Sequence, residues 1–162
     1  MIEADVLQAV WKSRDGWRVF RYSESGKRGC GSAKTKALFA VQYKPYKGYN
    51  VPQFIAIETI PDFSGSTFKA FAGNKITSGS ILVSDGFSSY NSLAKNYTVI
   101  PTSAASHDET SPLKLVHLFI SNAKALFQRT FHGLSAKYVQ GYFSEFIYHH
   151  NSRVTKCLLL ST

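Results

Sequence analysis

Short apolar segments in the first hundred residues predict β-strands. Each segment is an alternating or continuous apolar run of a few residues, and each ends at a cluster of turn-forming residues. Residues 44–50, which include a proline and a glycine, join the second and third segments as a hairpin. The five predicted strands cover residues 2–10, 36–43, 53–60, 81–83 and 97–101.

Apolar residues at helical spacing appear mainly in the last third of the chain. One long helix is predicted over residues 112–129, with Pro112 in its opening turn, and a second over residues 136–151. Two shorter helices are predicted over residues 67–75 and 87–95. The apolar face of the first long helix consists of Leu113, Val116, Ile120, Ala123 and Phe127.

The order of these elements is strand, strand, strand, helix, strand, helix, strand and helix. This is the succession of the ribonuclease H-like fold, an α/β fold in which helices flank a five-stranded mixed sheet, and other α/β arrangements share it. The 162 residues and 44% apolar content suffice for one such core. We therefore predict a single domain over residues 1–162.

Asp85 directly follows the fourth predicted strand. The apolar run Ile81–Val83 lacks polar alternation, which is typical of a strand covered on both faces, and residues 86–89 then break it. Open α/β sheets place ligands and catalytic groups at the carboxyl ends of their strands. Asp85 is therefore a candidate metal ligand or acid–base group, and the alternative is that it only caps the next helix.

The predicted fold gives Asp85 a partner on the first strand. Enzymes with this fold bring together an acid from the first strand, one from the fourth and a third ligand from a late helix, around two Mg²⁺ ions that share a phosphate. Asp5 and Asp85 occupy the first two places. Two adjacent carboxylates repel without cations between them, so the pair predicts a site for two Mg²⁺ or Mn²⁺ ions roughly 3.5–4 Å apart.

The third ligand has several candidates on the later part of the chain. At about 100° per residue, His117 and Lys124 lie on nearly one line of their helix, whereas Asn122 is turned by about 140° from His117. His117 and Lys124 are thus placed to face one DNA phosphate, although Mg²⁺ prefers oxygen ligands to imidazole. A hydrogen-bonded histidine at the border of the core is the alternative for His117. The candidates are Glu109, His117, Asn122 and Glu145.

An excess of basic residues favours an anionic partner. The chain has 19 Lys and Arg against 10 Asp and Glu, a formal net charge of +9, which suits nucleic acid and would equally fit an acidic membrane surface. Residues 11–36 mix basic and aromatic side chains, as in a loop on a phosphate backbone, or as in a solvated loop with its tryptophans on the core. The predicted DNA contacts are Lys27, Arg28, Lys34, Lys36, Lys124 and Lys137.

Several other classes of protein are disfavoured. No apolar run is long enough to span a membrane and no signal-peptide pattern opens the chain, which predicts a cytoplasmic protein with no membrane partner. Cys30 and Cys157 have no metal-ligand spacing and are predicted to be reduced thiols. The chain lacks the Gly-x-Ser-x-Gly motif of serine-nucleophile hydrolases.

Motifs along nearly the whole chain match one known family. They are Ile2–Asp5, residues 26–36, Val83–Phe87 and, most specifically, His117–Lys124, Thr130–Gly133, Lys137–Tyr138 and Tyr142–Phe146. With these motifs the chain resembles the catalytic domain of bacterial insertion-sequence transposases of the DDE superfamily, in the ISXO-like branch. Val6 departs from the pattern, because relatives usually carry a second acid there.

The resemblance implies DNA strand cleavage and strand transfer, with Asp5 and Asp85 as metal ligands. It implies that Asn122, or His117 with Lys124, replaces the glutamate of the superfamily. It also implies a bacterial protein associated with the nucleoid, with DNA as its partner, that forms a homo-oligomer when active.

A DNA-binding segment usually precedes the catalytic domain in such transposases. Only four residues precede Asp5 here, so the resemblance predicts a catalytic-domain fragment. The alternative is a decayed or repurposed copy that binds nucleic acid without catalysis.

Overall fold

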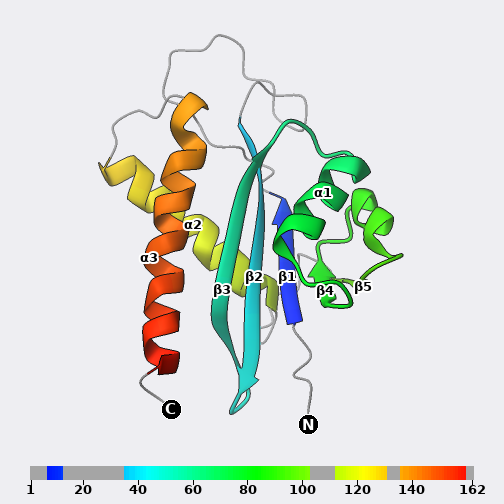
Figure 1. Ribbon diagram of the computed structural model, residues 1–162, viewed down its shortest axis with the longest axis horizontal. Helices are drawn as coiled ribbons and strands as arrows, with labels where there is room; N and C mark the ends of the chain where they lie inside the picture. The colour runs from blue at the N-terminus through cyan, green and yellow to red at the C-terminus, as the bar shows by residue number, and fades with distance from the viewer. Residues whose placement is uncertain (1–6, 13–34, 103–111, 131–135, 160–162) are drawn as a thin grey trace.

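One mixed sheet forms the centre of the protein. The computed structural model describes residues 7–12, 35–102, 112–130 and 136–159 (Figure 1). β1 pairs antiparallel with β2 and β2 with β3, whereas β4 runs parallel to β1 and β5 parallel to β4. The sheet order is β3-β2-β1-β4-β5. The strands are β1 (Leu7–Lys12), β2 (Lys36–Tyr46), β3 (Tyr49–Ile60), β4 (Ile81–Ser84) and β5 (Thr98–Pro101).

Helices cover both faces of this sheet. One face packs against α1 and the 3₁₀ helix η1, and the other against α2 and α3, with the short 3₁₀ helix η2 before α3 (Figure 1). Strand alternation separates the two cores: Phe39 and Val41 face α2 and α3, whereas Leu38 and Ala40 face α1. The predicted mixed α/β class is confirmed. The helices are α1 (Gly65–Lys75), η1 (Ser88–Leu93), α2 (Pro112–Thr130), η2 (Ala136–Tyr138) and α3 (Val139–Leu159).

Two predicted helices differ from those in the structure. The helix predicted over residues 87–95 is the 3₁₀ helix η1 instead, because its serines bond to backbone carbonyls: the Ser92 hydroxyl donates to Ser89 and Gly65, and the Ser89 hydroxyl to Phe63. The last helix continues eight residues beyond its predicted end at residue 151, to Leu159. No proline or glycine interrupts that stretch.

The strand boundaries also differ at three places. β1 begins at Leu7 and includes Trp11, which was predicted to start a basic loop. β2 and β3 extend to Tyr46 and Tyr49, so the predicted seven-residue connection is a two-residue turn. In that turn Lys47 and Gly48 both have positive φ angles, of 50° and 83°.

The outer edge of β3 is closed by side chains of α3. The Asn151 side chain accepts a hydrogen bond from the Ile55 N–H and donates one to the Ile55 carbonyl, both at 3.0 Å. The Gln140 side chain accepts from the Thr59 N–H at 2.7 Å and donates to the Ile57 carbonyl at 3.4 Å. An uncovered edge strand invites pairing with another chain. The two amides therefore replace a neighbouring strand.

We predict that Asn151→Ala destabilises the fold by about 1–3 kcal/mol, because it leaves both Ile55 backbone groups without these partners. Asn151→Asp should also be destabilising, since it keeps the acceptor and loses the donor. Urea unfolding measures both effects. The matched control is Thr155→Ala, an exposed site that bonds only to the α3 backbone, with an expected change within about 0.5 kcal/mol. Equal stability of Asn151→Ala and Thr155→Ala would contradict the edge-closing role.

Candidate functional site

Asp85 lies where β4 ends, as the sequence predicts. Val83, two residues before Asp85, packs into the core beneath α2 and α3. Gly86 follows with a φ of +74°, a backbone conformation that favours glycine. The turn brings the Phe87 N–H back to donate to Asp85 Oδ1 at 3.3 Å. Asp85 is therefore a half-buried carboxylate whose orientation a backbone N–H helps to fix.

His117 on α2 is an electrostatic neighbour of Asp85. Its pKa lies below the ordinary value of 6.5, first because the surrounding chain desolvates the imidazole and also because the Lys124 cation repels its proton. The Asp85 carboxylate opposes this by raising the His117 pKa. His117 is exposed as a residue, yet enough of its ring is shielded for desolvation to dominate. The imidazole is consequently neutral at neutral pH.

Tyr90, a residue of η1, is a second described group whose pKa responds to Asp85. Its side chain is buried, and its ring meets Phe68 edge-on at a centroid distance of 4.7 Å. Burial raises the pKa of Tyr90 well above its ordinary value, and the Asp85 charge raises it further. Asp85 thus acts electrostatically on a protonated phenol on one side of the sheet and on a neutral imidazole on the other.

Asn122 does not share the position of His117. It is exposed on α2, about 140° around the helix from His117. Lys124 is seven residues after His117, nearly in line with it and about 10 Å along the axis, and its charge acts on the His117 pKa. Asp85 and Lys124 therefore both act electrostatically on His117, and helix geometry turns Asn122 toward another side of α2.

The other candidate ligands do not join this group within the described structure. Asp5 and Glu109 lie outside the described residues. Glu145 is exposed on α3, where its carboxylate lies 3.9 Å from the His149 imidazole. Across the described ranges no three His, Cys, Asp or Glu side chains gather closely enough to hold a metal ion.

The register of β1 determines what lies level with Asp85. Leu7 pairs with Ile81 and Val10 with Ser84, so the β1 residues that follow Val10 are the ones nearest the end of β4. Val10 is five residues after Asp5 in the chain. Sharing an ion between the two aspartates requires that the chain before Leu7 bring Asp5 to this end of β4.

Three of the six predicted DNA contacts are in the described part of the chain, and each has a distinct setting. The Lys36 ammonium donates to the Pro61 carbonyl at 2.9 Å. Lys137 is exposed before α3, with its Nζ 5.5 Å from the ring centroid of Tyr138. Lys124 is the one beside His117. Lys27, Arg28 and Lys34 lie outside the described residues.

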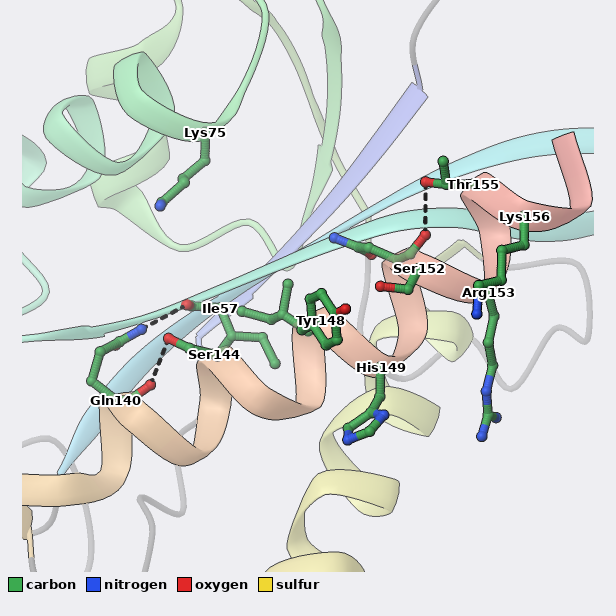
Figure 2. Close-up of a pocket in the computed structure, with 12 residues that line it drawn as sticks. Ile57, Lys75, Gln140, Ser144, Tyr148, His149, Ser152, Arg153, Thr155 and Lys156 are labelled. Atoms are coloured by element: carbon green, nitrogen blue, oxygen red, sulfur yellow. Dashed lines mark hydrogen bonds between the residues drawn. The ribbon is translucent and has the colours of Figure 1, made fainter. Parts of the chain in front are cut away.

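A groove of about 800 Å³ runs between the β3 edge and α3, away from Asp85 (Figure 2). Lys75 reaches in from α1, and Arg153 extends from α3 away from β3 (Figure 2). β3 and β4 are separated by two strands, so the groove and the carboxylate lie at different parts of the sheet. The groove contains none of the predicted ligands.

Comparison with known proteins identifies the family. The ISXO2-like transposase domain matches residues 15–151, which include Asp85, His117, Asn122 and Lys124 but not Asp5. The chain belongs to the ISXO2-like transposase domain family. No curated protein matches this chain.

Solved structures show the fold of this ISXO2-like domain. The catalytic core domain of BIV integrase is similar over 89% of this chain and 82% of its own, with a TM-score of 0.52 and 14% identity, a likeness that concerns the fold alone. A pre-cleavage Mos1 transpososome matches 96% of this chain and 55% of that chain, with a TM-score of 0.36 and 12% identity. The Mos1 mariner paired end complex with Mn matches 94% and 54%, with a TM-score of 0.35 and 12% identity.

No helix in the described part of the ISXO2-like domain is long and apolar enough to cross a membrane.

The sequence-based assignment to insertion-sequence transposases is confirmed at the level of the family. Sequence reasoning did not predict the electrostatic effect of Asp85 on Tyr90.

We predict that NMR titration of the metal-free protein gives His117 a midpoint below 6.5, because burial disfavours the imidazolium. Asp85→Asn should lower the midpoint further, since it removes a charge that raises the pKa, and Lys124→Gln should raise it. Below pH 6.5 protonation of His117 is harder in the folded chain than in the unfolded chain, so the free energy of unfolding decreases as pH falls.

Lys69→Gln is the control for this titration. Lys69 is exposed on α1, which packs on the other face of the sheet, so its loss should leave the His117 midpoint unchanged. An unaltered midpoint in both Asp85→Asn and Lys124→Gln would mean that the three side chains are not neighbours.

Proposed function

We propose that this domain cleaves and rejoins DNA phosphodiester bonds in a divalent-metal-dependent reaction of transposition. The observation that supports the proposal is the position of Asp85 at the carboxyl end of β4, in a chain of the ISXO2-like family, where its charge acts on His117. Carboxylates at that edge of an α/β sheet are placed for ligand chemistry. DNA is the proposed substrate and partner, and a homo-oligomer is the proposed active form.

Asp85 and His117 are the proposed metal ligands on the described side of the site. A carboxylate and a neutral imidazole are both ligand types that divalent ions accept. The proposed second acid is Asp5, whose carboxylate would supply the further ligand that a site for two ions needs. Bound Mg²⁺ or Mn²⁺ would supply Lewis-acid stabilisation of the attacking and leaving oxygens of the phosphodiester.

The protein's own groups have separate proposed tasks. The Phe87 N–H donates to one Asp85 oxygen and so helps to fix the carboxylate. His117 stays neutral and so adds no positive charge to repel a cation. Lys124, almost two turns along α2, is positioned to neutralise a phosphate beside the reacting one. Asn122 is not proposed as a ligand, because helix geometry turns it about 140° around α2 from His117.

The charge of the chain supports DNA as the substrate. The formal net charge of +9 attracts a polyanion such as DNA, and salt weakens this electrostatic attraction. Each phosphate that a lysine neutralises contributes about 0.9 to the slope of log affinity against log salt concentration. Lys124 therefore has a measurable contribution to binding that is separate from metal binding.

We predict that the protein nicks supercoiled plasmid with Mg²⁺ or Mn²⁺, and that Asp85→Asn and His117→Ala each reduce the rate at least about 100-fold. Loss of residues that only support a metal ligand already costs 10–100-fold in affinity or activity, so loss of a ligand should cost no less. Asn122→Ala should retain activity. Conversion of supercoiled to open-circular plasmid measures the rate.

Asp5→Asn tests the second acid in the same assay. Loss equal to that of Asp85→Asn supports a shared site, whereas full activity assigns the second acid elsewhere. Undiminished nicking by Asp85→Asn would refute the proposed site. Salt-sensitive DNA binding with no nicking under either metal would replace this function with DNA binding alone.

We predict that Lys124→Ala reduces the salt slope of plasmid binding by about 0.9, because one phosphate contact is lost. Filter binding across a range of salt concentrations measures the slope. Lys69→Ala removes an exposed lysine on the other face of the sheet and serves as the charge-matched control. Equal slopes for the two variants would remove Lys124 from the DNA interface.

A further inference from the structure

The β2–β3 hairpin ends in a turn that places a lysine in an unfavourable backbone conformation. Lys47 and Gly48 form the two-residue turn, and Lys47 has a φ of +50°. Two-residue hairpin turns of this kind favour Asn or Gly at both positions. A bulky residue held at positive φ is an outlier that often accompanies a functional site. The turn thus keeps a cation at the tip at some cost in backbone energy.

Two tyrosines share one face of this hairpin. Tyr46 pairs directly with Tyr49, and Lys44, two residues before Tyr46, pairs with Val51. Residues that pair directly, or that are two apart on a strand, point to the same side, so these four side chains form one surface. Tyr46 is 58% exposed and Tyr49 77% exposed, and both lysine-flanked rings are therefore open to solvent.

The tip is basic as well as aromatic. Lys44 and Lys47 are exposed, and Lys47 Nζ lies 5.3 Å from the ring centroid of Tyr46. Residues 36–57 contain no aspartate or glutamate. The surface therefore combines exposed aromatic rings with positive charge that no acid of its own segment compensates.

We propose that this hairpin face binds an unpaired stretch of DNA, with bases stacked on Tyr46 and Tyr49 and phosphates contacted by Lys44 and Lys47. Aromatic rings bind single strands by stacking on exposed bases, and basic side chains follow the backbone. Duplex DNA hides its base faces and offers the rings nothing to stack on. A second copy of this chain is disfavoured, because it would bring two clusters of lysines together.

The hairpin is remote from Asp85, and the proposal rests on the proposed function only in taking DNA as the partner. Leu7 pairs with Tyr43 on one side and with Ile81 on the other, so these three residues lie in one row across the sheet. Tyr46 is three residues from this row in one direction, and Asp85 is four residues from it in the opposite direction. Seven residues of extended strand span about 23 Å. The hairpin therefore binds DNA away from the proposed reacting phosphate and does not touch it.

Fluorescence anisotropy with an oligothymidylate and with a duplex of equal length tests the proposal. Tyr46→Ala and Tyr49→Ala should each weaken binding of the single strand about tenfold and leave duplex binding nearly unchanged. Tyr46→Phe and Tyr49→Phe should bind like the unaltered protein, because the ring is kept. Circular dichroism checks that the variants fold, as expected for side chains that are exposed.

Tyr148→Ala is the matched control, since Tyr148 is 69% exposed on α3 and lies outside the hairpin. Photocrosslinking of iododeoxyuridine in the same oligonucleotide should label residues 46 and 49 in the unaltered protein. Asp85→Asn, in which nicking is expected to be lost, should bind the single strand normally, so failure of cleavage and failure of this proposal are separate results.

Three outcomes would overturn the proposal. Unchanged single-strand binding by the Tyr46→Ala, Tyr49→Ala double variant would remove the stacking surface. Equal weakening of single-strand and duplex binding would assign the hairpin to backbone contacts alone. A change in sedimentation of the DNA-free protein, without a change in DNA binding, would identify a contact between copies of the chain.

Discussion

The parallel pairing of β1 with β4 is the constraint on which the rest of the structure depends. It joins the antiparallel strands β1, β2 and β3 to the parallel pair β4 and β5, in one sheet. A parallel neighbour requires a crossover connection, which α1 supplies between β3 and β4. Ser84 is the last residue of β4 that pairs with β1, so Asp85 is the first residue after the paired strand. Asp85 is still half-buried there.

The balance of electrostatic effects around Asp85 distinguishes this site from a cluster of acids. Desolvation outweighs the attraction of Asp85 at His117, so the imidazole carries no charge to compensate the carboxylate. The described side of the site therefore has one negative charge, with the Lys124 cation near it. Such a site attracts a divalent cation less strongly than three carboxylates do. DNA phosphates, which bring their own negative charge, are the natural complement to that deficit.

The sequence predicted the parts of the site that depend on local pattern. The apolar face of α2 has helical spacing, and its five predicted residues, from Leu113 to Phe127, are all buried. Asp85 follows a buried strand, and the apolar residues directly before it predicted that strand. The choice between His117 and Asn122 as a third ligand does not follow from local pattern, because both positions are compatible with a helix.

Contacts between distant residues explain most of what the sequence left open. Asn151 and Gln140 close the edge of β3 from positions 96 and 81 residues away, and no local pattern signals such a pairing. The serines of η1 redirect a segment with helix-like apolar spacing by bonding to Phe63 and Gly65 on another segment. In both cases side-chain hydrogen bonds to backbone groups override what hydrophobic periodicity alone predicts.

The topology of the sheet separates its two candidate DNA contacts by necessity. Because β1 and β4 are parallel, their carboxyl ends lie at the same end of the sheet, and Asp85 lies at that end. β2 runs antiparallel to β1, so its turn into β3 lies at the opposite end of the sheet. Lengthening the hairpin moves its tip farther from Asp85 and never closer. A hairpin at this end of the sheet can affect the reaction only by holding a DNA strand that also reaches Asp85 at the other end. Its proposed role is therefore to position DNA, with no direct part in the chemistry.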